Sequence, residues 1–278
     1  MRWRLCLLRL AAACLALLGG SNAGYCQAPA GEKLSLKNYR LTFDEEFKTL
    51  SISARGPDTR WIAHTPWHGD FGDAQFVDPT PNFPFTIAPG GGLRIEARKG
   101  NDGKWRSGLI CSRNSDSPHA VGFAQKYGYF EMRAKLPLGA GLWPAFWLIG
   151  VDKEHSSAEI DIMEEYGVDP RIYHAGLHIW RKAGASVEAG QAVTLPPGTL
   201  TGQFNDYGVR IDPQWIVYYF NRNEVWRTPT APDFRQPLYI LADLALGGGW
   251  PIDKTPSPSV MEIQYIRAYQ ENPPPSGQ

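Results

Sequence analysis

Residues 127–136 alternate strictly between two kinds of side chain, and they read Tyr127-Gly128-Tyr129-Phe130-Glu131-Met132-Arg133-Ala134-Lys135-Leu136. Successive side chains of a β-strand point to opposite faces, so this period of two predicts a half-buried strand. Residues 92–98 repeat the pattern, with Leu93, Ile95 and Ala97 set against Arg94, Glu96 and Arg98.

Short strand patterns separated by turn signals fill the chain from about 36 to 270. The segments are Tyr39–Phe47, Gly92–Arg98, Tyr127–Leu136, Trp143–Ile149, Ala158–Tyr166, Ile172–Trp180, Tyr207–Ile211, Trp215–Asn221, Leu238–Leu246 and Met261–Gln270. Hairpin turns are expected at 212–214 and 221–223. No segment of ten or more residues has helical periodicity. The pattern predicts an all-β protein, a jelly-roll sandwich of two antiparallel sheets.

Composition agrees with this fold and excludes several functions. The chain of 278 residues is only slightly longer than the roughly 200–250 residues that a single all-β domain can reach. Basic and acidic residues number 28 each, so we expect no nucleic-acid partner. The hydrophobic fraction of 43% suffices for a large core.

The first 28 residues resemble a secretory signal peptide. A basic start is followed by an apolar run from Leu5 to Leu18 and then by small residues, which places cleavage between about 23 and 30. The run is short for a membrane anchor, and a lipoprotein with Cys14 lipidated is an alternative. Removal of Arg2, Arg4 and Arg9 from the 28 basic residues leaves 25 against 28 acidic ones. We expect a secreted protein, extracellular or periplasmic, that is not bound to the membrane after cleavage.

Three regions follow from this division: the signal peptide 1–28, one β-sandwich domain 36–270, and a Pro-rich tail 271–278 that we expect to be disordered. Cys111 is expected to be a small buried hydrophobic residue, because it has no partner for a disulfide or a C-x-x-C site. We expect a monomer that requires no cofactor.

The densest group of acids is Glu159-Ile160-Asp161-Ile162-Met163-Glu164-Glu165. On a strand, Glu159 and Asp161 share a face while Ile160 and Ile162 enter the core. A β-bulge near Met163 would add Glu164 to that face, whereas a regular strand would add Glu165. Parity alone does not choose between them.

Three interpretations of this group stay open on the residues alone. Cleavage of a glycosidic bond needs two carboxyl groups, one ionised and one protonated, held roughly 5–5.5 Å apart in retaining enzymes. Three carboxylates would also suit calcium, and a solvated acidic strand face needs no ligand at all. Aromatic residues nearby favour a sugar site, since Trp143 and Trp147 share one face of their strand and Gly176 and His178 share one face of another.

The acidic group resembles the E-x-D-x-x-E signature of glycoside hydrolase family 16 in its bulged form. Five further stretches are similar to other strands of the family: Phe43-Asp44-Glu45-Glu46-Phe47, residues 127–135, Gly141-Leu142-Trp143-Pro144-Ala145-Phe146-Trp147, residues 239–251 and Ile266-Arg267-Ala268-Tyr269-Gln270. The resemblance covers about residues 36 to 270 in order. It implies a concanavalin-like jelly roll with a concave substrate cleft, retaining hydrolysis and secretion.

The resemblance also implies residue roles. Glu159 would be the nucleophile, Asp161 its helper and Glu164 the acid/base, which favours Glu164 over Glu165. Trp143 and Trp147 would line the donor subsites, with Arg133, His178 and Trp250 nearby. Family members often hold calcium on the convex face, so calcium near Glu46, beside Asp44 and Glu45, is one expectation, and a solvated acidic strand is the other.

The chain departs from the laminarinase-like branch in two places, at Trp67-His68-Gly69-Asp70-Phe71-Gly72-Asp73-Ala74-Gln75-Phe76 and at Ala242-Asp243-Leu244-Ala245-Leu246. It looks nearer the bacterial exopolysaccharide depolymerases of the succinoglycan type. We therefore expect an endo-β-glycanase for a β-1,3- or mixed β-1,3/1,4-linked glucan or a bacterial exopolysaccharide. A transglycosylase and a non-catalytic sugar-binding jelly roll are the alternatives. The loop from Trp61 to Phe83 is expected to wall the donor side, where Trp67 either binds substrate or plugs the core.

Overall fold

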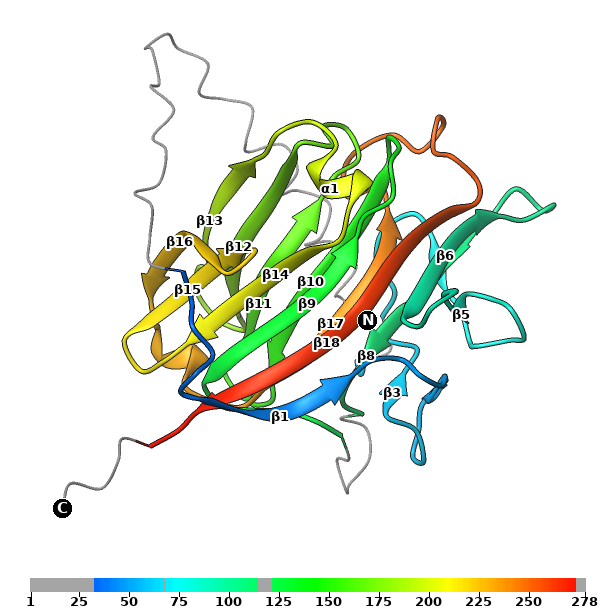
Figure 1. The fold of residues 1–278 in the computed structure, drawn as a ribbon. Helices are drawn as coiled ribbons and strands as arrows, with labels where there is room; N and C mark the ends of the chain where they lie inside the picture. Colours follow the sequence, from blue (N-terminus) through cyan, green and yellow to red (C-terminus); the bar gives the residue numbers. More distant parts are fainter. Residues whose placement is uncertain (1–32, 68, 115–121, 274–278) are drawn as a thin grey trace, which may run out of the picture.

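The computed structural model describes residues 33–67, 69–114 and 122–273, and these residues form two packed β-sheets (Figure 1). The signal-peptide prediction and residues 274–278 of the predicted tail lie outside the described residues. None of the helices in the described part of the chain has the length and apolarity that crossing a membrane requires.

One sheet has ten strands among the described residues, in the order β16-β15-β14-β9-β18-β6-β7-β4, with β1 added to β18 and β5 to β6. Figure 1 shows the long β18 in red between β9 and β6. The strands are β1 (Tyr39–Glu45), β4 (Gln75–Phe76), β5 (Phe85–Ile87), β6 (Leu93–Lys99), β7 (Trp105–Ser107), β9 (Gly128–Lys135), β14 (Asn205–Ile211), β15 (Trp215–Phe220), β16 (Asn223–Pro229) and β18 (Ser259–Glu271).

The second sheet has eight strands among the described residues, in the order β13-β12-β11-β10-β17-β8-β3-β2. They are β2 (Ile52–Ser53), β3 (Trp61–Ile62), β8 (Leu109–Cys111), β10 (Leu142–Gly150), β11 (Ser156–Glu165), β12 (Ile172–Arg181), β13 (Val187–Thr194) and β17 (Leu238–Leu246). The helices described are α1 (Thr199–Gly202) and the 3₁₀ turn η2 (Pro232–Phe234). The prediction of an all-β sandwich is therefore confirmed, but the short pairs β2–β3 and β4–β7 are parallel, so neither sheet is purely antiparallel.

All ten predicted strands are present, most within one or two residues of the expected ends. The turns at 212–214 and 221–223 join β14 to β15 and β15 to β16, and Asn221 and Arg222 both have positive φ. Two longer strands were missed. The edge strand β13 is almost entirely exposed and rich in Ala and Gly, and β16 is another edge strand with a mixed pattern.

The core lies between the sheets, and the alternation of each strand decides what enters it. Phe130, Met132 and Ala134 of β9 are fully buried there, as are Phe146 and Leu148 of β10. The opposite face of β10 carries Trp143, Ala145, Trp147 and Ile149, which pack into a second apolar cluster on the outer face of the eight-stranded sheet.

Residues of the segment 54–83 cover part of this outer face. Ile62, Phe71 and Phe76 from this segment pack with Trp147 and Leu241 of the sheet. The segment therefore forms a wall over the outer surface of β10 and β17, next to the strand β11 that carries the acidic group.

Candidate active site

A β-bulge in β11 decides which acids share a face. Asp161 pairs with Gly176 of β12, and the next pair is Glu164 with His174. Between these two pairs, β11 therefore contains one residue more than β12. The register with β10 shifts at the same place. Ile162 and Met163 are both buried in the core. The bulge predicted near Met163 is therefore present, and it brings Glu164 to the face of Glu159 and Asp161.

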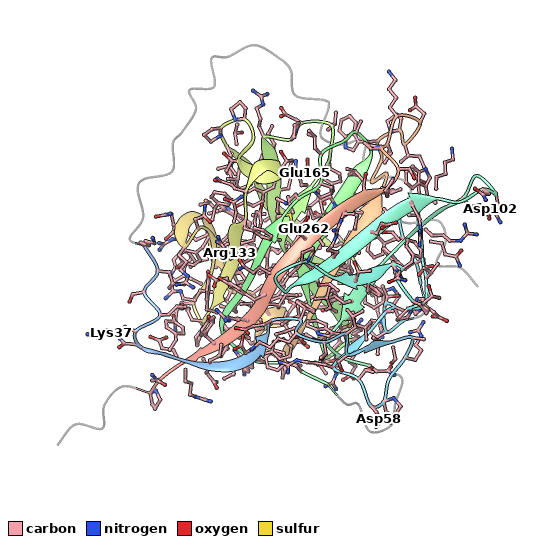
Figure 2. All side chains as sticks on the ribbon, turned by 45° about the vertical axis from the view of Figure 1, so that its right-hand side comes forward. Lys37, Asp58, Asp102, Arg133, Glu165 and Glu262 are labelled. Atoms are coloured by element: carbon pink, nitrogen blue, oxygen red, sulfur yellow. The ribbon has the colours of Figure 1, made fainter. Side chains whose placement is uncertain are left out.

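Glu165 takes the opposite direction. Its side chain is fully buried on the core side of β11, where it pairs with Tyr173. Neither of its carboxylate oxygens has a hydrogen-bond partner among the described residues, and burial raises the pKa of Glu165 to about 8. Glu165 and Arg133 are labelled in Figure 2, on different sheets of the sandwich.

We call the outer surface of the eight-stranded sheet that carries Glu159, Asp161 and Glu164 the carboxylate face. Burial, followed by the negative charge of Glu164, raises the pKa of Glu159 to about 7. Burial, then Glu164, Glu159 and Asp243, raises the pKa of Asp161 well above its usual value. Burial also raises the pKa of Glu164. These carboxyl groups therefore hold protons at a pH where isolated acids would be ionised.

Aromatic donors orient the carboxylate at one end of this face. The Trp143 indole Nε1 donates to Glu164 Oε1 at 2.9 Å, and the Tyr166 hydroxyl reaches the same oxygen at 3.4 Å. The Trp143 and Tyr166 rings are stacked at 5.8 Å. Hydrogen bonds from both rings favour the ionised form of Glu164 and oppose the effect of burial.

Histidine and tryptophan occupy the other end. His178 lies directly across from Glu159 on β12, and its Nε2 is 3.4 Å from Asp161 Oδ2. The His178 ring stacks on Trp180 at 4.8 Å with the planes nearly parallel. Glu159, Asp161 and His178 each present one ligand atom, all within 4.8 Å of one another, so they are the described residues that could hold a metal ion.

Asp243 is a fourth carboxyl group that the sequence analysis did not single out as a site residue. It is fully buried on β17, where Trp147 Nε1 donates to its Oδ1 at 2.8 Å and the Ala245 amide donates to its Oδ2 at 3.1 Å. Burial raises the pKa of Asp243 to about 8. A lone acid within the apolar strand Leu238–Leu246 was the signal that could have identified it.

Lys153, in the turn between β10 and β11, was also missed. Its ammonium group lies 4.4 Å from the centre of the Trp67 ring. Burial lowers the pKa of Lys153, while the charge of Glu159 raises it. No periodic pattern in the sequence marks this turn residue.

The tryptophans of the predicted substrate site differ in exposure. Trp67 and Trp250 are 42% and 41% exposed, and Trp143 is half-buried. Trp147 is only 6% exposed, beneath Trp67 and Phe71, whose rings lie 6.0 and 5.8 Å away. Trp147 therefore offers little surface to a sugar, although it supports Trp67, which does. His68, in the same loop, lies outside the described residues.

Arg133 does not lie near the acidic group, so its predicted place in the substrate site is wrong. Its strand β9 belongs to the ten-stranded sheet, and its guanidinium binds Asp206 Oδ1 at 3.0 Å and Gln264 Oε1 at 2.8 Å on the outer face of that sheet (Figure 2). The core separates this face from the carboxylate face. Alternation predicted the face of Arg133 within its strand, but did not tell which sheet the strand joins.

The acids near Glu46 already have cationic partners. Arg267 binds Asp44 at 2.8 Å and Glu46 at 2.9 Å, and Lys48 binds Glu46 at 2.7 Å. Glu45 accepts from Trp61 Nε1 at 3.0 Å. These oxygens do not form an open calcium site as they stand, and calcium binding here stays a prediction, which melting curves with excess calcium and with EDTA would test.

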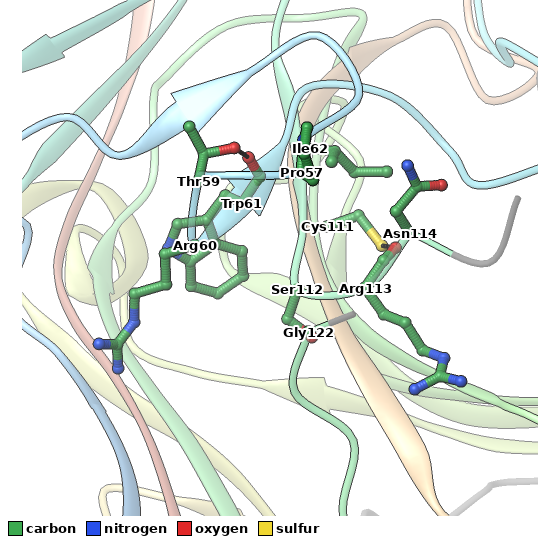
Figure 3. Close-up of a pocket in the computed structure, with 11 residues that line it drawn as sticks. Pro57, Thr59, Arg60, Trp61, Ile62, Cys111, Ser112, Arg113, Asn114 and Gly122 are labelled. Atoms are coloured by element: carbon green, nitrogen blue, oxygen red, sulfur yellow. Dashed lines mark hydrogen bonds between the residues drawn. The ribbon is translucent and has the colours of Figure 1, made fainter. Parts of the chain in front are cut away.

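A small pocket lies elsewhere, beside the buried Cys111 and between β3 and β8 (Figure 3). Its volume of about 10 Å³ is roughly that of one water molecule. Burial raises the pKa of Cys111 to about 12, so the thiol stays protonated. The prediction of a buried, unpaired cysteine is confirmed.

Two rhizobial proteins are similar to this chain over 82% of its length. The endo-1,3-1,4-beta-glycanase EglC of Rhizobium meliloti is 32% identical over 251 residues, 82% of this chain and 51% of the relative. ExsH of the same organism, also an endo-1,3-1,4-beta-glycanase, is 31% identical over 253 residues, again 82% of this chain and 51% of the relative. The chain thus spans about half the length of these relatives.

A solved structure and a family model agree with these relatives. The laminarinase catalytic domain of Thermotoga maritima superposes with a TM-score of 0.66 at 25% identity, covering 85% of this chain and all of that domain. The family model described as glycosyl hydrolases family 16 matches residues 92–267, which include the whole carboxylate face of β11. The chain belongs to glycoside hydrolase family 16.

Proposed function

We propose that the protein is a secreted endo-β-glycanase that cleaves a β-1,3- or mixed β-1,3/1,4-linked glucan, or a bacterial exopolysaccharide, with retention of configuration. The observation that carries the proposal is the bulge in β11, which puts Glu159, Asp161 and Glu164 on one face with raised pKa values. Clustered acids that resist ionisation are typical of glycosidase sites.

In the proposed reaction, Glu159 attacks the anomeric carbon while Glu164 protonates the oxygen of the leaving sugar. Glu164 then takes a proton from a water molecule as the water oxygen attacks the anomeric carbon, so the bond from that carbon to Glu159 breaks and the sugar is released. The indole of Trp143, bonded to Glu164 Oε1, would hold this carboxyl group in one orientation during both steps.

Burial raises the pKa of both glutamates, and groups beside each one oppose that effect. Lys153 and Trp180 favour the ionised form of Glu159, the proposed nucleophile. Asp161 lies between the two glutamates, and its pKa is raised most strongly by burial and then by Glu164. A protonated Asp161 would donate a hydrogen bond to Glu159 and so keep the negative charge on the nucleophile.

Substrate would lie against the exposed aromatic surface beside these acids. Trp67 and Trp250 each expose about two fifths of their surface, and flat apolar rings suit the faces of sugar rings. His178, beside the nucleophile, would contact the sugar at the bond that is cleaved. The two rhizobial relatives are both named endo-1,3-1,4-beta-glycanases, which supports a mixed β-1,3/1,4-linked polymer as the substrate.

Azide tests the nucleophile and the stereochemistry together. Glu159→Gly should reduce turnover on the preferred glucan by several powers of ten, and external azide should restore activity and give a glycosyl azide of inverted configuration. Glu164→Gly should give an azide product of retained configuration. The proposal fails if azide rescues neither variant, although both fold normally, or if the wild type gives products of inverted configuration.

A further inference from the structure

We propose that Glu159, Asp161 and His178 form an inhibitory binding site for a divalent cation of borderline softness, such as Zn²⁺. The three residues present one ligand atom each, all within 4.8 Å of one another. Binding of the ion rests only on these contacts, whereas inhibition also rests on the proposed function of Glu159.

The backbone fixes this arrangement. Glu159 and His178 are direct partners across β11 and β12, and Asp161 is the next residue of β11 on the same face. His178 cannot turn freely, because its ring is stacked on Trp180 with 6° between the planes. The three ligand groups are therefore held on one rigid surface, which reduces the entropy lost when a metal binds.

An unsatisfied buried oxygen points to a ligand at this place. Asp161 is only 4% exposed, and its Oδ2 has no hydrogen-bond partner in the described structure. The nearest basic atom is His178 Nε2 at 3.4 Å, which is longer than an N–H···O hydrogen bond of about 2.7–3.2 Å. A cation between the two atoms would satisfy both.

The separation also fits a particular ion. Bonds of about 2.0–2.2 Å in a tetrahedral zinc site place neighbouring ligand atoms about 3.4 Å apart, as Asp161 Oδ2 and His178 Nε2 are now. Glu159 would have to move its carboxylate by roughly 1 Å to complete the set. Calcium and magnesium prefer six or more oxygens, so one imidazole and two carboxylates favour Zn²⁺.

Occupation of this site would stop the proposed reaction. The ion would bind the carboxylate oxygen that Glu159 needs for attack on the anomeric carbon. It would also lie where the sugar must approach. Zinc should therefore compete with substrate, so that the apparent KM rises linearly with the free zinc concentration while kcat at saturating glucan stays unchanged.

Calorimetry on metal-free protein tests binding apart from activity. Zn²⁺ should bind with one-to-one stoichiometry, and His178→Gln should weaken binding by more than about tenfold, since even outer-shell partners of metal ligands change affinity by about 10–100-fold. Circular dichroism verifies that the variant is folded. The matched control is His155→Gln, because the His155 side chain is 86% exposed in the turn before β11, and it should bind zinc as the wild type does.

The visible spectrum of Co²⁺-loaded protein provides a second readout, because intense absorption marks a four-coordinate site. Equal zinc affinity in the wild type and His178→Gln, or no saturable binding to the wild type, would overturn the site. Binding without competitive inhibition of an active enzyme would overturn the inhibitory role. A protein that binds zinc but cleaves no glucan would contradict the proposed function and leave the metal site supported.

Discussion

The two outer faces of this sandwich bury carboxyl groups in opposite ways. On the ten-stranded sheet, the fully buried Glu131 receives two bonds of 2.9 Å from Arg222 and further bonds from the hydroxyls of Tyr129 and Tyr265. On the carboxylate face, no Arg or Lys among the described residues forms an ion pair with Glu159, Asp161, Glu164 or Asp243. A paired buried acid depends on its cation, since loss of one partner strongly destabilises a fold. Grouped acids without cations have raised pKa values, which are typical of functional sites.

The largest effect on stability is expected where the paired acid loses its partner. Arg222→Met leaves Glu131 charged and buried, so the free energy of unfolding should fall by about 3–5 kcal/mol in urea denaturation. The double variant Arg222→Met/Glu131→Leu should recover most of this loss, because an apolar pair replaces the ion pair. A small effect of Arg222→Met alone would show that the two faces do not differ in this way.

Glu165 should show the reverse behaviour, since no residue that the structure describes forms a hydrogen bond with its buried carboxyl group. Glu165→Met should stabilise the protein by about 1–3 kcal/mol. The pKa of Glu165 is raised to about 8 in the fold, so the contribution of its protonation to stability is complete below the unfolded pKa and is lost as the pH rises through 8. The gain from Glu165→Met should therefore be larger at pH 9 than at pH 6. A gain that shrinks as the pH rises would contradict the burial of this acid.

Trp67 tests whether the wall beside the carboxylate face binds substrate. Trp67→Ala should raise KM about fivefold, equivalent to about 1 kcal/mol for one aromatic contact, with kcat and melting temperature nearly unchanged. Trp215 is a matched control, because it is 39% exposed on the other sheet; Trp215→Ala should leave KM unchanged. A sharp fall in the melting temperature of Trp67→Ala would instead make Trp67 a core residue.

The smallest effect is expected from Lys153, whose charge favours the ionised form of Glu159. Without that charge the pKa of Glu159 should rise above about 7, so Lys153→Met should move the acid limb of the kcat/KM profile to higher pH. Lys153→Arg keeps the charge and should keep the profile. If the acid limb of the kcat/KM profile were identical in the wild type and both variants, the charge of Lys153 would have no effect on the pKa of Glu159.

Alternation and turns predicted the fold because each strand buries one face, as Phe130, Met132 and Ala134 do. The same rule could not choose between Glu164 and Glu165, because a bulge is set by the pairing with β10 and β12 and not by β11 itself. Arg133 was misplaced for a related reason, since periodicity does not say which strands become neighbours. Asp243 and Lys153 were missed because their environment comes from residues far away in the sequence.

A comparison of Glu164 with Glu165 tests the assignment of the active site most directly. These two adjacent acids differ chiefly in the face of β11 to which the bulge directs them. We expect Glu164→Gln to lower kcat on the preferred glucan by about 10²–10⁴ or more while the fold remains intact. Glu165→Gln should keep kcat within about twofold of the wild type. An inactive Glu165→Gln together with an active Glu164→Gln, both folded, would contradict the assignment of the carboxylate face as the active site.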